Sequence, residues 1–144
     1  MKNSIDHAVA FFSRKPRALF LLDGLGAALT SLSLFFVIGQ YEPYFGMPIH
    51  ILTYLSVLGL VYCIYSMSCF FFLKSYWTPC LRIIGMSNLL YCMVTMTLMY
   101  AYYHVLTPFG LAYFSGEILI IVSLVYIELR VANMLKPKSS GKVL

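Results

Sequence analysis

Two acidic residues stand inside apolar stretches that are long enough to cross a membrane. Asp23 lies in the segment LLDGLGAA, and Glu117 lies in the segment SGEILIIV. A charged side chain inside hydrocarbon is costly unless a partner faces it, so such acids usually point into the protein. The chemistry open to them is proton binding, contact with a polar ligand, or hydrogen bonding between helices.

Other polar side chains fall at matching depths when positions are counted at about 1.5 Å of rise per residue. They form two layers, one around each acid: Asp23 with Ser66, Ser87, Asn88 and Ser123, and Glu117 with Thr30, Tyr62, Tyr91 and Thr95. No Lys or Arg belongs to either layer. We therefore expect Glu117 to be protonated, whereas Asp23 stays ionised if Arg17 or Arg82 extends towards it.

These layers have two interpretations. In the first, the acids hold helices together, since polar contacts between membrane helices contribute about 0.6 to 2 kcal/mol each. In the second, Asp23 and Glu117 form a short proton path or a substrate site. Glu128 and Arg130, further along the last apolar run, are interpreted instead as a pair that marks the membrane boundary.

Small residues follow Asp23 on the same helix. Gly24 and Ala28 are four positions apart, and Gly26 has the same spacing from Thr30. Small residues at this spacing let two membrane helices approach closely. We expect this face of the first helix to be a packing surface.

The elements that carry these residues are apolar runs at about 17–39, 48–73, 80–104 and 108–131. Each has the roughly 20 residues that a membrane-spanning helix needs, and a proline stands at or just before the head of each. Short connections favour antiparallel neighbours. The fold prediction is all-α: one integral membrane domain over residues 1–144, built as an antiparallel bundle of four transmembrane helices. Residues 4–15 add a short amphipathic helix, expected to lie at the membrane interface.

Composition and charge agree with a membrane location. The chain is 61% hydrophobic and 10% charged, whereas soluble domains carry about 25% charged residues. All Lys and Arg side chains flank the runs on one side of the expected membrane: Lys2, Arg14, Lys15, Arg17, Lys74, Arg82, Arg130, Lys136, Lys138 and Lys142. Because cytoplasmic loops carry the excess of basic residues, both termini are expected in the cytoplasm.

Signals for enzyme chemistry are missing from the sequence. Hydrolase, zinc-protease and phosphate-binding motifs do not occur, and the cysteines lack a C-x-x-C pair. His50, His104 and Glu42 could together hold a metal ion, but their spacing matches no motif. We expect no enzymatic activity, no cofactor and no metal site. The basic residues form no stripe of the kind that binds nucleic acid, so the expected partners are the lipid bilayer and other membrane proteins.

Several segments resemble small four-span membrane proteins of unknown function from bacteria of the Bacteroidetes type. They are LFLLDGLGAALT, YEPYFGMP, LRIIGMSNLLYC and EILIIVSLVYIELRVAN. The resemblance implies a bacterial inner (cytoplasmic) membrane and no particular activity.

Two functions follow from these observations. The leading prediction is an accessory or homo-oligomeric membrane protein that packs through its first helix and its polar layers. The alternative is a small proton-coupled transporter that uses Asp23 and Glu117. In outline it is similar to small multidrug-resistance proteins, which also have four helices and an intramembrane glutamate, although here that glutamate is on the fourth helix.

Overall fold

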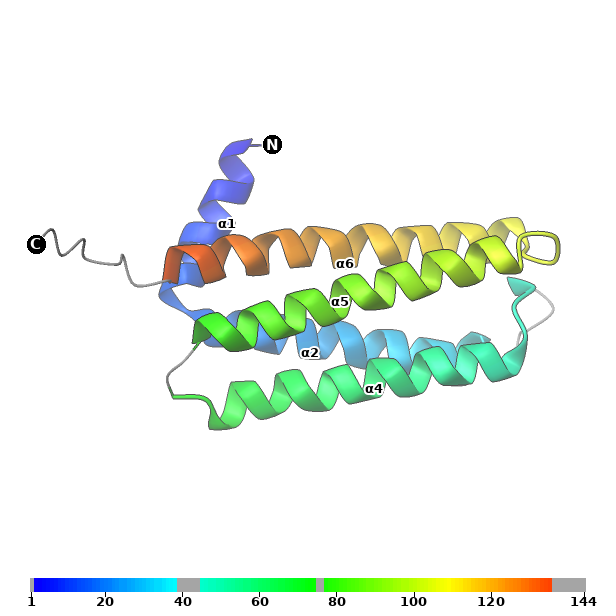
Figure 1. Ribbon diagram of the computed structural model, residues 1–144, viewed down its shortest axis with the longest axis horizontal. Coiled ribbons are helices and arrows are strands. Elements are labelled where there is room, and N and C mark those ends of the chain that lie inside the picture. Colours follow the sequence, from blue (N-terminus) through cyan, green and yellow to red (C-terminus); the bar gives the residue numbers. More distant parts are fainter. Residues whose placement is uncertain (1, 39–44, 75–76, 136–144) are drawn as a thin grey trace, which may run out of the picture.

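The computed structural model describes residues 2–38, 45–74 and 77–135. These residues are almost entirely helical (Figure 1). The elements are α1 (Lys2–Arg14), α2 (Pro16–Leu32), the π-helical segment η1 (Ser33–Ile38), α4 (Ile49–Phe72), α5 (Trp77–Ala101) and α6 (Pro108–Leu135). No strand occurs in these described ranges.

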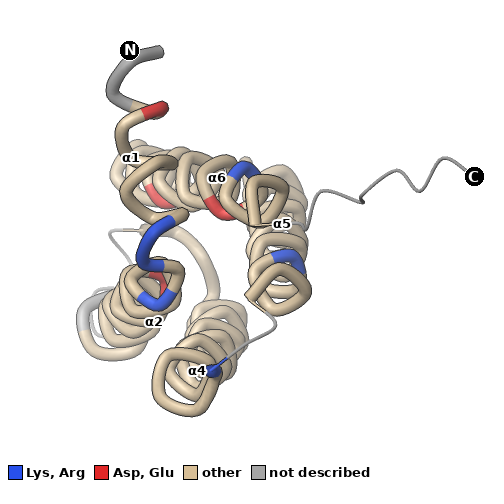
Figure 2. The backbone as a smooth tube through the Cα atoms, turned by 90° about the vertical axis from the view of Figure 1, so that its left-hand side faces the viewer, with Lys and Arg blue, Asp and Glu red and all other residues tan. Residues whose placement is uncertain are grey.

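The long helices run side by side with alternating direction, as Figure 1 shows. The structure holds 4 helices that are long and apolar enough to cross a membrane. The predicted all-α bundle of four transmembrane helices is therefore confirmed. We call the end where α2 and α5 begin and α4 and α6 finish the basic end, because the Lys and Arg residues that Figure 2 colours blue gather there.

Proline positions explain where helices begin, and the burial of side chains explains where α6 ends. Pro16 begins α2, where the missing N–H needs no partner. Helix α5 begins earlier than expected, at Trp77, so that Pro79 falls in its first turn, where proline is still tolerated. Helix α6 continues past the expected end at 131 to Leu135. It does so because Val131 and Ala132 are buried against other elements.

The first spanning helix is not regular throughout, although an unbroken helix to 39 was expected. After Leu32 the chain widens into the π-helical segment η1. The Ser33 backbone N–H is shared between the carbonyl oxygens of Leu29 and Thr30 at this junction. Such π segments often lie at functional sites.

Helix α1 crosses the basic end of the bundle instead of running along it (Figure 1). Its buried residue Val9 packs with Val131 and Ala132 of α6, and Ile5 and Phe12 flank this contact. The apolar stripe that was expected to face the membrane surface thus packs partly on the bundle itself. Phe11 remains exposed beside it.

The bundle consists of two tightly packed pairs, α2 with α4 and α5 with α6, which contact each other less extensively. Between α2 and α4, the Ser31 hydroxyl donates to the Ser56 carbonyl at 2.8 Å. The Ser56 hydroxyl donates to the Ser31 carbonyl at 2.9 Å. We call this reciprocal arrangement the serine clamp.

Two apolar clusters close the bundle at its ends. The basic-end cluster contains Val9, Leu19, Phe20, Leu81, Ile84, Val131 and Ala132. The far-end cluster contains Leu34, Met47, Leu52, Leu55, Tyr91 and Phe114. Most of the buried polar side chains lie between them, and this arrangement leaves the middle of the bundle as the place for a site.

Candidate functional site

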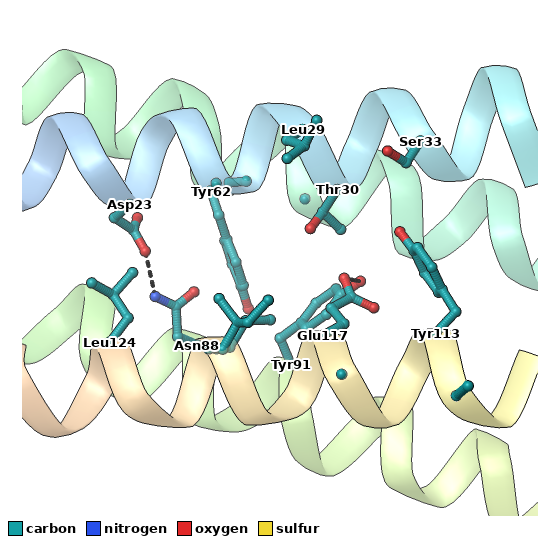
Figure 3. A pocket seen from close by; sticks show the side chains of 17 residues that line it. Asp23, Leu29, Thr30, Ser33, Tyr62, Asn88, Tyr91, Tyr113, Glu117 and Leu124 are labelled. Atoms are coloured by element: carbon teal, nitrogen blue, oxygen red, sulfur yellow. Dashed lines mark hydrogen bonds between the residues drawn. The ribbon is translucent and has the colours of Figure 1, made fainter. Parts of the chain in front are cut away.

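A cavity of about 410 Å³ lies between the two helix pairs. Its walls come from α2, η1, α4, α5 and α6, and most of the labelled side chains point into it (Figure 3). The polar residues that line it are Asp23, Thr30, Ser33, Tyr62, Asn88, Tyr91, Tyr113 and Glu117. The remaining lining residues are small or aliphatic, so the cavity is mainly apolar with a few convergent polar groups, as in most ligand sites.

Asp23 lies at one end of the cavity and is only 3% exposed. The Ser66 hydroxyl of α4 donates to Asp23 Oδ2. The Asn88 amide of α5 donates to Asp23 Oδ1 at 2.6 Å (Figure 3). One carboxyl group therefore links three helices.

Glu117 lies in the middle of the cavity and is 8% exposed. The Tyr91 hydroxyl donates to Glu117 Oε1 at 3.1 Å. Within the described residues Glu117 Oε2 has no hydrogen-bond partner. The Thr30 hydroxyl points towards this carboxyl from the opposite wall (Figure 3). A buried polar atom without a partner is rare in native proteins, so Glu117 Oε2 calls for an explanation such as a catalytic role, a water molecule or an ion.

The guanidinium groups that were considered as partners of Asp23 bind elsewhere. Arg17 donates to the Leu73 carbonyl at 3.2 Å and stacks over Trp77. Arg82 donates to the Asn133 side chain at 3.0 Å. The condition set for an ionised Asp23, that Arg17 or Arg82 extends towards it, is therefore not met, and no cation lines the cavity among the described residues.

The cavity opens sideways between α2 and α6. A Cβ atom placed on Gly26 of α2 or on Gly116 of α6 would meet nothing within 4 Å. Leu29 and Ile120, on the same two walls, are 68% and 73% exposed although they line the cavity. This opening faces the hydrocarbon of a surrounding bilayer, because both helices are candidate spans.

Most residues singled out in the sequence meet around this cavity. Asp23, Ser66 and Asn88 touch, as do Glu117 and Tyr91. Thr30 and Tyr62 line the cavity. Thr95 is buried but does not line it. Ser87 is half-buried, and the Ser123 hydroxyl bonds within its own helix, so neither joins the first layer.

The small residues of α2 have different surroundings. A Cβ atom on Gly24 would stand 2.7 Å from Met67 Cε of α4, so this glycine packs within the chain. Gly26 faces the cavity opening, and Ala28 is half-buried outside the cavity lining.

Sequence reasoning missed three contributors to this region. Ser33 and Tyr113 face each other across the end of the cavity beyond Glu117 (Figure 3). Glu128 was interpreted with Arg130 as a marker of the membrane boundary, and that interpretation did not foresee that its side chain is 0% exposed. Its position held a signal, since eleven residues of α-helix turn through about three full turns and bring Glu128 to the face of Glu117.

The possible metal site is not supported by the part of the chain that the structure describes. There, no group of three or more His, Cys, Asp or Glu side chains could hold a metal ion. Glu42 lies outside the described residues, and His50 and His104 are exposed. The cysteines are free thiols.

No family model, curated protein or solved structure matches this chain. Fold and site alone therefore define its class. It is a multi-pass integral membrane protein whose apolar helices contact the lipid bilayer and whose core contains a cavity lined by carboxyl groups.

Proposed function

We propose that this protein is a small transporter that exchanges protons for a compact, mainly apolar molecule carrying one positive charge. The observation that carries the proposal is the Oε2 atom of Glu117, which is buried in the cavity wall and has no hydrogen-bond partner in the described part of the chain. Of the two functions expected from the sequence, this geometry favours the proton-coupled one.

Charge balance explains the coupling. With one hydrogen-bond donor and no cation among the described lining residues, the Glu117 carboxyl is most stable when it is neutral, and a bound proton makes it so. A positively charged ligand neutralises the same carboxylate, so the ligand and the proton compete for one site. Glu117 and Asp23 then provide proton-binding positions at two depths, and Tyr91 orients Glu117.

We propose further that the protein lies in a bacterial inner membrane with both termini in the cytoplasm. Support comes from the charge distribution, because the Lys and Arg residues coloured in Figure 2 gather at the basic end. Lys136, Lys138 and Lys142 lie outside the described residues.

An assembly role, as an accessory subunit or a homo-oligomer, is the second candidate. It relied on the face of Gly24, Gly26 and Ala28 as a packing surface and on the polar layers within the membrane. Gly24 packs on α4 of its own chain and Gly26 faces the cavity opening, which leaves less of this face for a partner. We also expect no enzymatic activity.

The test uses three probes of similar size: benzyltrimethylammonium, benzylamine and neutral benzyl alcohol. We expect purified protein to bind the two cations, to release a proton on binding the first, and to bind the alcohol less tightly. In proteoliposomes a pH gradient should drive uptake of the cations. Glu117→Gln should weaken cation binding about 30-fold, because loss of one member of a buried charge pair costs about 2 kcal/mol or more.

Asp6→Asn is the matched control, since it changes an exposed acid of α1 to its amide. It should bind the cations like the wild type. The proposal is refuted if the wild type binds none of the probes, or if Glu117→Gln and Asp23→Asn leave binding and proton-coupled uptake unchanged. Native mass measurement on the same samples tests the assembly role.

A further inference from the structure

Glu128 is a buried acid outside the cavity that the exchange described above does not use. Its side chain is 0% exposed, and neither Oε1 nor Oε2 has a hydrogen-bond partner among the described residues. It fits between α5 and α6 because the facing residue is Gly85. A Cβ atom on Gly85 would stand 3.4 Å from Glu128 Oε2.

The position of Glu128 links the cavity to the basic end. It lies on the same face of α6 as Glu117, about 16 Å further along the helix axis. One turn later, Val131 and Ala132 belong to the basic-end cluster. Glu128 therefore lies where that cluster separates the cavity from the basic end.

Among the residues that the structure describes, the groups around Glu128 give it polar neighbours but no cation. Asp23 of α2 and Asn88 of α5 interact with it electrostatically. Arg82 of α5 bonds to Asn133, Arg130 of α6 bonds to Tyr126, and Arg17 of α2 bonds to the Leu73 carbonyl after α4. On α1, the acid Asp6 is exposed. A carboxyl group so enclosed carries its proton, since an isolated buried carboxylate is strongly unfavourable.

We propose that Glu128 is a proton-exchanging site that passes protons between Asp23 and water at the basic end of the bundle. In this step the O–H bond of Glu128 breaks, an O–H bond forms on the Asp23 carboxylate, and the negative charge moves to Glu128. A hydronium ion from the basic end then restores the proton on Glu128. The biological role of this exchange rests on the proposed transport function. The first test below does not depend on that function.

Asn88 can support either state of this pair. Its amide nitrogen donates to Asp23 Oδ1 in the present arrangement, which fits a charged Asp23 beside a neutral Glu128. After the transfer, the same amide can stabilise the new carboxylate.

The first test is infrared difference spectroscopy on the purified wild type and on three variants. We expect a protonated carboxyl band that disappears in Glu128→Gln, persists in Glu117→Gln and shifts in Asp23→Asn. Glu128→Gln keeps the size and neutral charge of the group, so its thermal unfolding should match the wild type. If no band depends on Glu128, or if Asp23→Asn leaves that band unshifted, the inference is wrong.

The second test separates this inference from the proposed function. Glu128→Gln should bind benzyltrimethylammonium within twofold of the wild type, because the cavity acids are intact. Its proton-coupled uptake should fall at least tenfold, and Glu128→Asp should recover part of it. Uptake at the wild-type rate in Glu128→Gln would overturn the relay. A wild type that binds no cation would refute the proposed function, while the infrared result still decides whether Asp23 and Glu128 exchange a proton.

Discussion

Asn88 lies between two acids of the polar interior, Asp23 and Glu128. Its amide donates to Asp23, and it lies in the field of Glu128 as well. A carboxylate that loses such a donor keeps its burial but loses the interaction that compensates for it. Loss of the Asn88 amide should therefore destabilise the fold, because the Asp23 carboxyl would stay buried with one donor fewer.

We predict that Asn88→Leu, which roughly keeps the side-chain volume, lowers the free energy of unfolding in detergent micelles by about 1–3 kcal/mol. The matched control is Asn133→Leu, because Asn133 is exposed and bonds only to the exposed Arg82. That variant should change the free energy by less than about 0.5 kcal/mol. Equal effects of the two variants would show that Asn88 does not hold the polar interior together.

Depth could be predicted from the sequence, but rotation about each helix axis could not. Counting the rise per residue placed Asn88 and Ser66 level with Asp23, and these side chains meet. It gave no direction by itself, and the burial of Glu128 was missed although its eleven-residue spacing from Glu117 indicated a shared helix face. In a soluble helix the apolar stripe reveals the inner face, whereas helices in lipid are apolar on every side and this signal is lost.

At the scale of elements, glycines determine how closely the chain packs near the far end. Gly46 has φ of 75°, a left-handed conformation that favours glycine. Gly110, at the start of α6, lies against the backbone carbonyl of Phe45. The Thr107 backbone N–H donates to that same carbonyl at 3.2 Å, so the carbonyl is held in place.

We predict that Gly110→Ala lowers the free energy of unfolding by about 1–3 kcal/mol, because the new methyl group meets backbone that has no room to move. Gly116→Ala is the control on the same helix, where the space is open. It should be neutral or stabilise by up to about 1 kcal/mol, since alanine favours helix. Denaturant titration of both variants measures the difference. A Gly110→Ala variant with the same free energy of unfolding as the wild type would contradict the packing described here.

The helices themselves were predictable, since apolar length and proline positions are written in the sequence. The pairing of the helices depends on a few specific side-chain contacts, which overall composition does not predict. The serine clamp holds α2 against α4, and Gly85 lets α5 approach α6. Helices α4 and α5 are also consecutive, yet they contact each other less. The π segment η1 has no sequence signature, so an unbroken helix was expected there.

At the scale of the whole molecule, the distribution of charge predicts its direction in the membrane. We expect Lys74→Cys, at the basic end, to react with a membrane-impermeant thiol reagent only after cells are permeabilised. Tyr103→Cys, in the turn after α5, should react in intact cells, since both side chains are exposed. The native cysteines are replaced by alanine in both variants. The reverse labelling pattern would show that the basic end faces away from the cytoplasm and would contradict the proposed topology.

The two end clusters have a consequence for the electrical behaviour of a cell membrane. The basic-end and far-end clusters place tightly packed hydrocarbon side chains between the cavity and either aqueous phase. An ion that entered along the axis would have to shed its hydration shell among aliphatic and aromatic groups, which is strongly unfavourable. In the resting bundle these clusters therefore exclude hydrated metal ions from the polar interior, so that charge crosses the basic-end cluster only as the protons that Glu128 is proposed to exchange.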